Sequence, residues 1–375
     1  MPRRWRHDLQ RADDVVSSHI CCTTGMNQRC ETEMIDFESR ESHLLVNPAM
    51  PADERARLEA LYASVDMDSH VFVATSGSTG SAKLVALSKR AILASAEAVN
   101  GRLASNSSDL WCAVLPTFHV GGLGIHARAH LSGAGVVTMP WDPRAFVRTN
   151  ATLASLVPAQ VYDLVELGTG PPKQLRAVLV GGGAFDQKLD ARARTLGWPV
   201  LASYGMSECA STISVREEVL PHLEARADSE GILEFRGASL LTGYVSEEGL
   251  VDPKAGGWLT TEDRGEVDGR TLRVFGRGEE FIKIGGESVD LKRLDRIAAE
   301  AARLCGGDAA VIAVSDGRMG HVIHLAATKL AIGPAFNDRV LPFERARQVH
   351  LVAGIPRSAL GKLLRAALAE QIRSR

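Results

Sequence analysis

Apolar runs alternate with amphipathic segments along most of the chain. Short apolar runs typical of buried strands lie at residues 71–73, 110–115, 135–139, 153–157, 177–180 and 200–203. Between them, apolar spacing and capping residues predict helices at 58–65, 88–100, 158–167 and 186–196. Strands that alternate with helices predict a largely parallel sheet with helices on its faces.

The pattern changes near residue 231. Short strands with turns are predicted at 232–236, 257–261 and 272–275, and then a helix at 291–303, strands at 309–314 and 321–328, and a terminal helix from 361. We therefore expect an α/β fold. Its large N-terminal domain (51–278) would hold mainly parallel sheets layered with helices, plus a β-rich section, and a small α+β domain would cover 279–375.

Residues 1–50 show little periodicity and carry Cys21, Cys22 and Cys30. We interpret this region as a poorly ordered tail that starts at Met1, or as the product of a mis-assigned start, with the true start at Met26 or Met34. The three cysteines lack the paired spacing of a zinc site. The 6 cysteines of the whole chain are few and scattered, which is typical of reduced thiols in the cytoplasm.

Composition excludes several classes of protein. The 375 residues are 45% hydrophobic and 23% charged, which argues against a disordered chain. A net charge of −2 argues against a nucleic-acid-binding protein. No apolar stretch reaches the roughly 18 residues of a membrane span, and no signal peptide is evident. We expect a cytoplasmic globular protein, and nothing in the sequence indicates its oligomeric state.

Glycine marks the first segment with candidate chemistry. The 35 glycines cluster after apolar strands, where the backbone turns tightly or approaches a ligand. The strongest cluster is Thr75-Ser-Gly-Ser-Thr-Gly-Ser-Ala-Lys83, whose hydroxyls, glycines and lysine suit a polyphosphate. It is not a Walker A loop, because Ala82 and Leu84 stand where that motif has glycine and a hydroxyl residue. The alternative is a generic polar loop.

Three further segments carry suitable side chains. Residues 203–208 (Ser-Tyr-Gly-Met-Ser-Glu) follow an apolar strand and offer a ring for a purine and a carboxylate for Mg²⁺. Residues 257–263 end in Asp263, which could accept ribose hydroxyls, and glycine-rich stretches follow at 276–280 and 283–287. Residues 356–362 present Lys362 at a turn before a helix.

Together these segments resemble the adenylate-forming superfamily of acyl- and aryl-CoA synthetases, adenylation domains and luciferases, over residues 70–370 and in the family's order. Within it, the stretches at 115–123, 156–160 and 175–183 look like o-succinylbenzoate–CoA ligases of menaquinone synthesis. Ser207 in the tyrosine segment points the same way. The resemblance implies a mobile C-terminal domain and a reduced N-terminal region. Glu262 and the Glu279-Glu280 pair depart from the family's usual Gly and Asp pair.

The resemblance also implies a role for each matching residue. Catalytic roles fall to Lys83, Ser207, Glu208 and Lys362, with Glu208 also holding Mg²⁺. ATP would be bound by Thr75, Ser76, Gly77, Ser78, Thr79, Gly80, Gly181, Gly182, Gly183, Tyr204, Asp263 and Arg277. His119 and Gly122 would belong to the acid pocket, Glu279 to the hinge, and Gly285 and Gly286 to the CoA channel.

The implied activity is ATP-dependent activation of a carboxylic acid as an acyl-adenylate and its transfer to CoA, with o-succinylbenzoate as the expected acid. Another aryl- or acyl-CoA ligase, a carrier-protein loader and a non-catalytic nucleotide-binding protein are the alternatives. A dicarboxylate needs a cationic or hydroxyl-rich pocket wall, but the sequence does not show which side chains face the pocket, and Arg128 is not assigned to it. His126 and His130 lack the glutamate of a metalloprotease motif and are not assigned to a metal.

Overall fold

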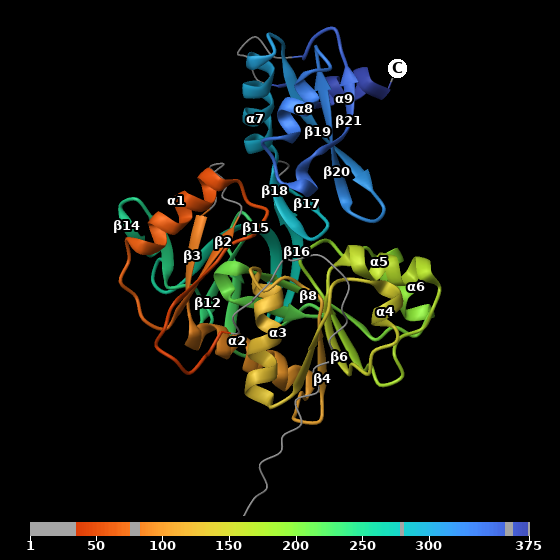
Figure 1. Cartoon of the computed structure of the whole chain (residues 1–375). Coiled ribbons are helices and arrows are strands. Elements are labelled where there is room, and N and C mark those ends of the chain that lie inside the picture. Colours follow the sequence, from red (N-terminus) through yellow and green to blue (C-terminus); the bar gives the residue numbers. More distant parts are fainter. Residues whose placement is uncertain (1–34, 76–82, 278–280, 357–362, 374–375) are drawn as a thin grey trace, which may run out of the picture. The chain divides into compact units, whose positions relative to one another are not determined.

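Five parallel strands form the part of the sheet that the alternating pattern predicts. We describe a computed structural model at residues 35–75, 83–277, 281–356 and 363–373 (Figure 1). The strands lie in the order β5 (Gly135–Thr138), β4 (Leu110–Ala113), β6 (Leu153–Leu156), β7 (Ala177–Val180) and β8 (Val200–Met206). All four neighbouring pairs are parallel, which confirms the predicted sheet.

Alternate residues of a strand point to opposite sides, and these strands are nearly unbroken apolar runs, so both faces of the sheet are apolar. Cys112 and Val178 pack with α5 (Pro158–Leu167) and α6 (Gln187–Thr195) on the face that α4 (Pro143–Phe146) also covers. Trp111 and Leu179 pack on the other face with α2 (Lys89–Leu103) and α3 (Val120–Ser132). Ser88 caps α2 by accepting a hydrogen bond from the Ala91 N–H, as predicted. α3 was not predicted, because three glycines near its start obscure the helical pattern.

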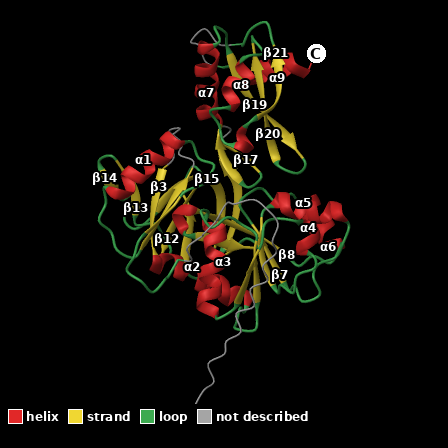
Figure 2. Ribbon diagram, viewed as in Figure 1, coloured by secondary structure: helices red, strands yellow, loops and turns green. Residues whose placement is uncertain are grey.

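The same sheet continues with antiparallel strands beyond β8 (Figure 2). Their order is β9 (Ser211–Val215), β10 (Glu218–Val219), β16 (Thr271–Arg277), β15 (Leu259–Asp268), β12 (Ile232–Gly237) and β11 (Leu223–Ala227). The β-rich section that the sequence predicts after residue 231 is therefore joined to the parallel strands in one 11-stranded sheet. β8 is the strand at which the pairing changes from parallel to antiparallel.

A second sheet contains the strands on either side of the predicted phosphate loop. Its order is β1 (His43–Leu45), β2 (His70–Thr75), β3 (Lys83–Ser88), β13 (Gly243–Ser246) and β14 (Gly249–Val251). α1 (Ala52–Ala63) packs on this sheet. β1 pairs with β2, so the sheet begins before residue 51, where the sequence analysis placed the start of the ordered chain. Residues 1–34 lie outside the described residues.

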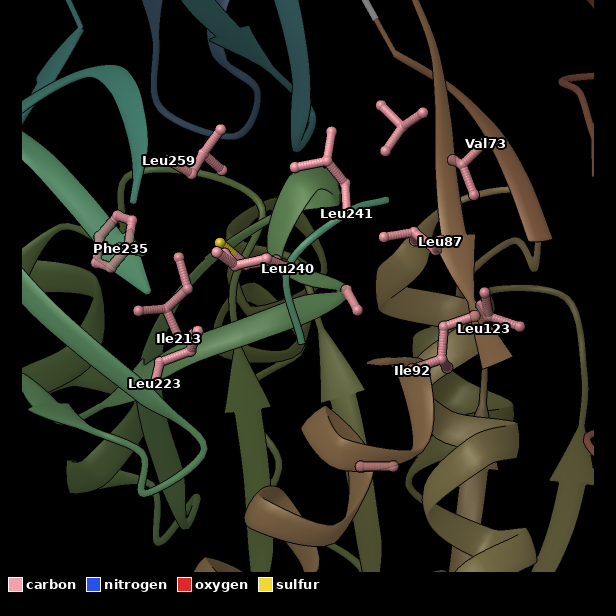
Figure 3. Packing of buried hydrophobic residues seen from close by; sticks show 14 of the residues in the cluster. Val73, Leu87, Ile92, Leu123, Ile213, Leu223, Phe235, Leu240, Leu241 and Leu259 are labelled. Atoms are coloured by element: carbon pink, nitrogen blue, oxygen red, sulfur yellow. The ribbon is translucent and has the colours of Figure 1, made fainter. Parts of the chain in front are cut away.

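A buried hydrophobic cluster joins the two sheets. Figure 3 shows Val73 and Leu87 of the second sheet and Ile92 of α2 facing side chains of the antiparallel strands, such as Ile213 and Phe235. Burial of apolar side chains is the main force that holds such layers together. The cluster therefore fixes the end of β2 and the start of β3 relative to the carboxyl end of β8.

The C-terminal elements form a sheet with helices and a core of its own. The sheet has the order β18 (Glu287–Asp290), β17 (Phe281–Ile284), β20 (Gly320–Ala327) and β19 (Ala309–Asp316), and β21 (Ala346–Leu351) also pairs with β20. The helices are α7 (Leu291–Leu304), α8 (Ile332–Asn337) and α9 (Arg365–Arg373). Residues 35–375 form one unit by their contacts, and a domain boundary at 278–279 stays a prediction.

None of the helices in the described ranges is long and apolar enough to span a membrane.

A buried carboxylate anchors the first parallel strand. Asp109 is 6% exposed and accepts hydrogen bonds from the Arg176 guanidinium (2.6 Å), the Thr152 hydroxyl (2.7 Å) and the Asn106 N–H (3.0 Å). The hydrogen bonds of Arg176, followed by those of Thr152 and Asn106, outweigh burial and lower the pKa of Asp109 to about 2. Ionised Asp109 therefore stabilises the folded chain at neutral pH.

We predict that Asp109→Asn lowers the free energy of unfolding by about 2 kcal/mol at neutral pH, measured by urea denaturation. Because the folded pKa lies below the unfolded value of about 3.9, this contribution is present above about pH 4 and is lost as pH falls toward about 2. The difference between the variant and the original chain should therefore shrink at about pH 3.

Asp190→Asn is the matched control. Asp190 pairs with Arg194 on the helix surface, where the two side chains are 30% and 40% exposed. Its loss should cost less than about 0.5 kcal/mol. Equal destabilisation by the two substitutions, or a pH-independent effect of Asp109→Asn, would contradict the assignment.

Candidate active site

Part of the predicted site lies outside the described residues. These positions are Ser76, Gly77, Ser78, Thr79, Gly80, Glu279 and Lys362. Arg277 is described through its backbone alone, which pairs with Asp263 across β15 and β16. The remaining predicted residues can be located.

The base of the predicted phosphate loop is a pair of neighbouring strands. Thr75 ends β2 and Lys83 begins β3, and the two residues are partners in the antiparallel ladder. The Lys83 Nζ lies 5.1 Å from the centre of the Tyr244 ring on β13, the next strand of that sheet. A cation over an aromatic face is an attractive arrangement, so Tyr244 helps to position the lysine.

Tyr244 also contacts the segment after β8. Its hydroxyl donates to Glu208 Oε1 at 3.0 Å, and Glu208 lies in the short 3₁₀ helix Ser207–Cys209. Lys83, Tyr244 and Glu208 therefore come together, although they lie far apart in the sequence. We find no group of three potential metal ligands among the described residues. A single carboxylate fits Mg²⁺ that is shared with substrate phosphates, because Mg²⁺ keeps several water and phosphate oxygens as ligands.

A hydrogen bond joins Tyr204 to Asp263. The Tyr204 hydroxyl donates to Asp263 Oδ2 at 2.5 Å, and Asp263 is 7% exposed. The Asp263 N–H in turn donates to the Thr261 hydroxyl at 3.1 Å. The ring that would stack on adenine and the carboxylate that would hold the ribose are thus held in one network.

Gly205 fixes the path of the chain between Tyr204 and Glu208. A Cβ at Gly205 would lie 1.7 Å from the Ser211 carbonyl oxygen, so a side chain there cannot be accommodated without moving the backbone. β9 can therefore return close against β8. Tyr204 directly precedes Gly205 in the chain. Ser207 and Glu208 lie after Gly205, in the segment between β8 and β9.

The glycines after β7 approach a hairpin of the C-terminal sheet. Gly285 and Gly286 connect β17 and β18 with φ of +61° and +99°, which side-chain-bearing residues rarely adopt. A Cβ at Gly182 would lie 3.4 Å from the Gly286 oxygen, and a Cβ at Gly286 would lie 2.7 Å from Val157 Cγ1. The structure thus brings the predicted adenine-binding glycines and the predicted CoA-channel glycines together.

The predicted acid-pocket residues lie at the start of α3. Gly122 is required there, because a Cβ would lie 2.1 Å from the Pro116 oxygen. His119 precedes the helix, and its Nε2 lies 2.7 Å from Glu287 Oε1, although the angles are not those of a hydrogen bond. Glu287 follows the Gly285-Gly286 turn, so the hairpin also contacts the acid-pocket segment.

Arg128, further along α3, is the largest buried cation in the described part of the chain. It is 2% exposed and donates to the hydroxyls of Ser155 (3.1 Å), Ser211 (3.3 Å) and Thr212 (3.0 Å). Its guanidinium also lies over the Trp111 ring, 5.6 Å from the ring centre. Among the described residues, no carboxylate lies within ion-pair distance of Arg128. Burial lowers the pKa of Arg128 to about 10, so the side chain remains charged at neutral pH.

Cys209 is a packing residue. It is fully buried beside Glu208, and burial together with the charges of Glu208 and Asp263 raises the pKa of its thiol well above the usual value. The thiol stays protonated at neutral pH, so it is a poor nucleophile.

Three contributors were not assigned from the sequence: Tyr244, Glu287 and Arg128. Tyr244 follows a glycine in a short apolar strand and carries no motif of its own. Glu287 ends the glycine-rich stretch at 283–287, and no motif assigns it a role. For Arg128, a lone arginine in an apolar helical segment was the available signal, since a buried arginine requires polar partners.

Comparisons with known proteins identify the family of the chain. The family model of AMP-binding enzymes matches residues 12–244. The chain is 34% identical to 2-succinylbenzoate–CoA ligase of Escherichia coli K12 over 66% of this chain and 56% of that enzyme. It is 30% identical to a probable 2-succinylbenzoate–CoA ligase of Mycobacterium tuberculosis CDC 1551 over 85% of this chain and 89% of that protein. The chain thus spans just over half of the first relative and most of the second.

Solved structures show the same fold. An o-succinylbenzoate CoA synthetase of Bacillus subtilis, with a product analogue bound, aligns with a TM-score of 0.71 at 24% identity over 81% of this chain and 69% of that one. An amide bond synthetase of Marinactinospora thermotolerans aligns with a TM-score of 0.69 at 24% identity over 80% of this chain and 69% of that one. The layered α/β architecture expected from the sequence is confirmed. The chain belongs to the AMP-binding enzyme family.

Proposed function

We propose that this protein activates o-succinylbenzoate with ATP and transfers the acyl group to CoA. In the first step, a carboxylate oxygen of the acid attacks the α-phosphorus of ATP, an acyl-adenylate forms, and pyrophosphate leaves. In the second step, the CoA sulfur attacks the acyl carbon and AMP leaves. We propose that the reaction takes place in the cytoplasm, where ATP and CoA are available.

The family and the geometry of the ATP side support the first step. Tyr204 and Asp263 form one polar network where adenine and ribose would lie, and Lys83 stands at the base of the phosphate loop. An anionic acid must approach an anionic nucleotide, so positive charge has to be fixed in advance. Lys83 supplies that charge, and we propose that Lys362 supplies more from the C-terminal part of the chain.

Glu208 is the proposed ligand of Mg²⁺. When bound, the ion would neutralise charge on the phosphates and help to orient them. The Tyr244 hydroxyl holds the Glu208 carboxylate in place, and its ring lies beside Lys83. One tyrosine thus positions both charged groups that face the phosphates in this proposal.

The contacts of the β17–β18 hairpin support the second step. Gly286 approaches Val157 and Gly182, and Glu287 approaches His119. The absence of side chains at Gly285 and Gly286 lets the hairpin pack closely against Met319 and Val157. We propose that the thiol reaches the acyl group along this hairpin.

The observation that carries the choice of acid is the buried charge of Arg128. A buried cation without an anionic partner is costly, and an arriving carboxylate would relieve that cost. The Arg128 guanidinium and the hydroxyls around it form a wall that is both cationic and polar. A dicarboxylate requires such a wall, and a fatty acid does not. Arg128 lies on the same helix that begins at the predicted acid pocket. We propose that it attracts the second carboxylate of o-succinylbenzoate.

We predict that Arg128→Met lowers kcat/KM for o-succinylbenzoate by about 10- to 100-fold, because a charged hydrogen-bond partner is lost. The original chain should form o-succinylbenzoyl-CoA and AMP with this acid and little product with benzoate or a medium-chain fatty acid. AMP release and the mass of the acyl-CoA product measure both outcomes.

Arg128→Lys is the control that keeps the charge, and it should retain an intermediate activity. Benzoate separates recognition from structure, because it lacks the second carboxylate. If Arg128→Met lowers activity with benzoate as much as with o-succinylbenzoate, Arg128 does not read that carboxylate. Preferential turnover of another acid by the original chain would overturn the proposed substrate.

We also predict that Tyr244→Phe raises the Mg²⁺ concentration needed for half-maximal pyrophosphate release and slows that step by about tenfold. The substitution removes the hydroxyl that holds Glu208 and keeps the ring beside Lys83.

Tyr62→Phe is the matched control, because the Tyr62 hydroxyl donates to the Ser42 carbonyl at 2.7 Å and contacts none of these residues. Its Mg²⁺ dependence should equal that of the original chain. An unchanged Mg²⁺ dependence in Tyr244→Phe would show that the tyrosine does not position the carboxylate.

A further inference from the structure

The turn between β19 and β20 is ordered by its own side chains. Asp316 Oδ1 accepts the N–H groups of Arg318 (2.9 Å) and Met319 (2.7 Å). The hydrogen bond from Met319, followed by that from Arg318, lowers the pKa of Asp316, so the carboxylate stays charged. Gly320 completes the turn with φ of +77°. The turn therefore presents Arg318 and Met319 in a fixed arrangement.

Arg318 forms a two-point ion pair with a residue of α5. Its Nε and Nη2 donate to Asp163 Oδ1 (2.6 Å) and Oδ2 (2.8 Å). The Trp141 indole N–H donates to the same Oδ2 at 2.9 Å, so the carboxylate is oriented before Arg318 binds it. Burial acts to raise the pKa of Asp163, but the hydrogen bonds from Arg318 and Trp141 outweigh it and lower that pKa.

Met319 connects the same turn to the Gly285-Gly286 hairpin. The Gly285 N–H donates to the Met319 carbonyl at 2.8 Å, and a Cβ at Gly285 would lie 2.6 Å from the Met319 methyl carbon. Gly286 in turn approaches Val157, which caps the start of α5. The C-terminal sheet therefore touches α5 at Val157 and again at Asp163, six residues or about 9 Å along the helix.

Contacts at two points along α5 fix the orientation of the C-terminal sheet, whereas a single contact would let the sheet pivot. We propose that the Asp163–Arg318 pair is a positioning device for the second half-reaction: it holds the C-terminal sheet so that the Gly285-Gly286 hairpin stays against Val157 while the thiol attacks. This inference rests on the proposed function. Asp163 and Arg318 are positioning residues, since neither touches a reacting atom.

The strength of the pair suits a contact that must also open. The Arg318 side chain is 45% exposed and that of Asp163 is 16% exposed, so water can replace each partner. Ion pairs that water reaches from one side contribute little net free energy, whereas two-point geometry gives directional specificity. The pair can therefore select one orientation without preventing the C-terminal part from leaving it for adenylation.

Two substitutions test the device. Arg318→Ala removes the cation, and Asp163→Asn removes the charge but keeps an acceptor for Trp141. Each should slow thioester formation from supplied o-succinylbenzoyl-adenylate and CoA by about fivefold. Pyrophosphate release in the first turnover without CoA should stay within about twofold of the original chain.

Arg192→Ala is the matched control. Arg192 of α6 pairs at 2.7 Å with Glu166 of α5, the helix that also carries Asp163, and the two side chains are 53% and 49% exposed. The control substitution should leave both half-reactions unchanged. Equal loss of both half-reactions in Arg318→Ala, or an unchanged thioester rate, would overturn the proposal.

A second readout separates this proposal from the proposed function. If the original chain forms no adenylate from o-succinylbenzoate, the proposed function fails, and hydrogen exchange in the protein without substrates then decides on the pair. Amides of residues 281–290 should exchange faster in Arg318→Ala than in the original chain or in Arg192→Ala. Equal exchange in the three proteins would overturn the positioning role.

Discussion

The close approach of Gly205 to the Ser211 carbonyl is the constraint on which the site depends. With no room for a Cβ, β9 returns tightly against β8, and the sheet changes from parallel to antiparallel pairing at this strand. The carboxyl end of β8 is thereby surrounded by elements from both parts of the sheet. Ligands in open α/β sheets bind at such ends, and the Tyr204 ring and the Glu208 carboxylate both lie there.

The polar groups around this strand end form two separate charged clusters. On one side, Tyr244 joins Lys83 to Glu208, which suits polyphosphate and a cation. On the other side, Arg128 stands buried among hydroxyls, which suits an anionic group of the acid. Fixed charges in a buried site are oriented before the substrate arrives, so they need little rearrangement during reaction. In the proposed function, the same arrangement would separate the nucleotide from the acid.

Local signals predicted the elements whose boundaries are chemically marked. The helix predicted at 158–167 has those bounds in the structure, because Pro158 suits a first helical position and Gly168 follows with φ of +70°. β7 was likewise predicted with its observed bounds from four consecutive apolar residues. α3 was missed because packing of its apolar residues against the sheet outweighs the cost of its glycines.

The site was predictable only as far as its motifs extend. The family resemblance assigned Tyr204 and Asp263 to the same nucleotide, and those roles stay a prediction. The structure adds the hydrogen bond that joins the two side chains. The contact between Tyr244 and Glu208 depends on β13 pairing with β3, which no local pattern reveals. The partners of Arg128 come from β6 and β9, so its role could not be read from α3 alone.

The most direct test of the central claim is exchange of labelled pyrophosphate into ATP without CoA. An enzyme that forms a bound acyl-adenylate reverses the first step, so exchange should require o-succinylbenzoate and Mg²⁺ and should not require CoA. That result is the one we expect. Absence of exchange with o-succinylbenzoate, or exchange that appears only when CoA is added, would contradict the account.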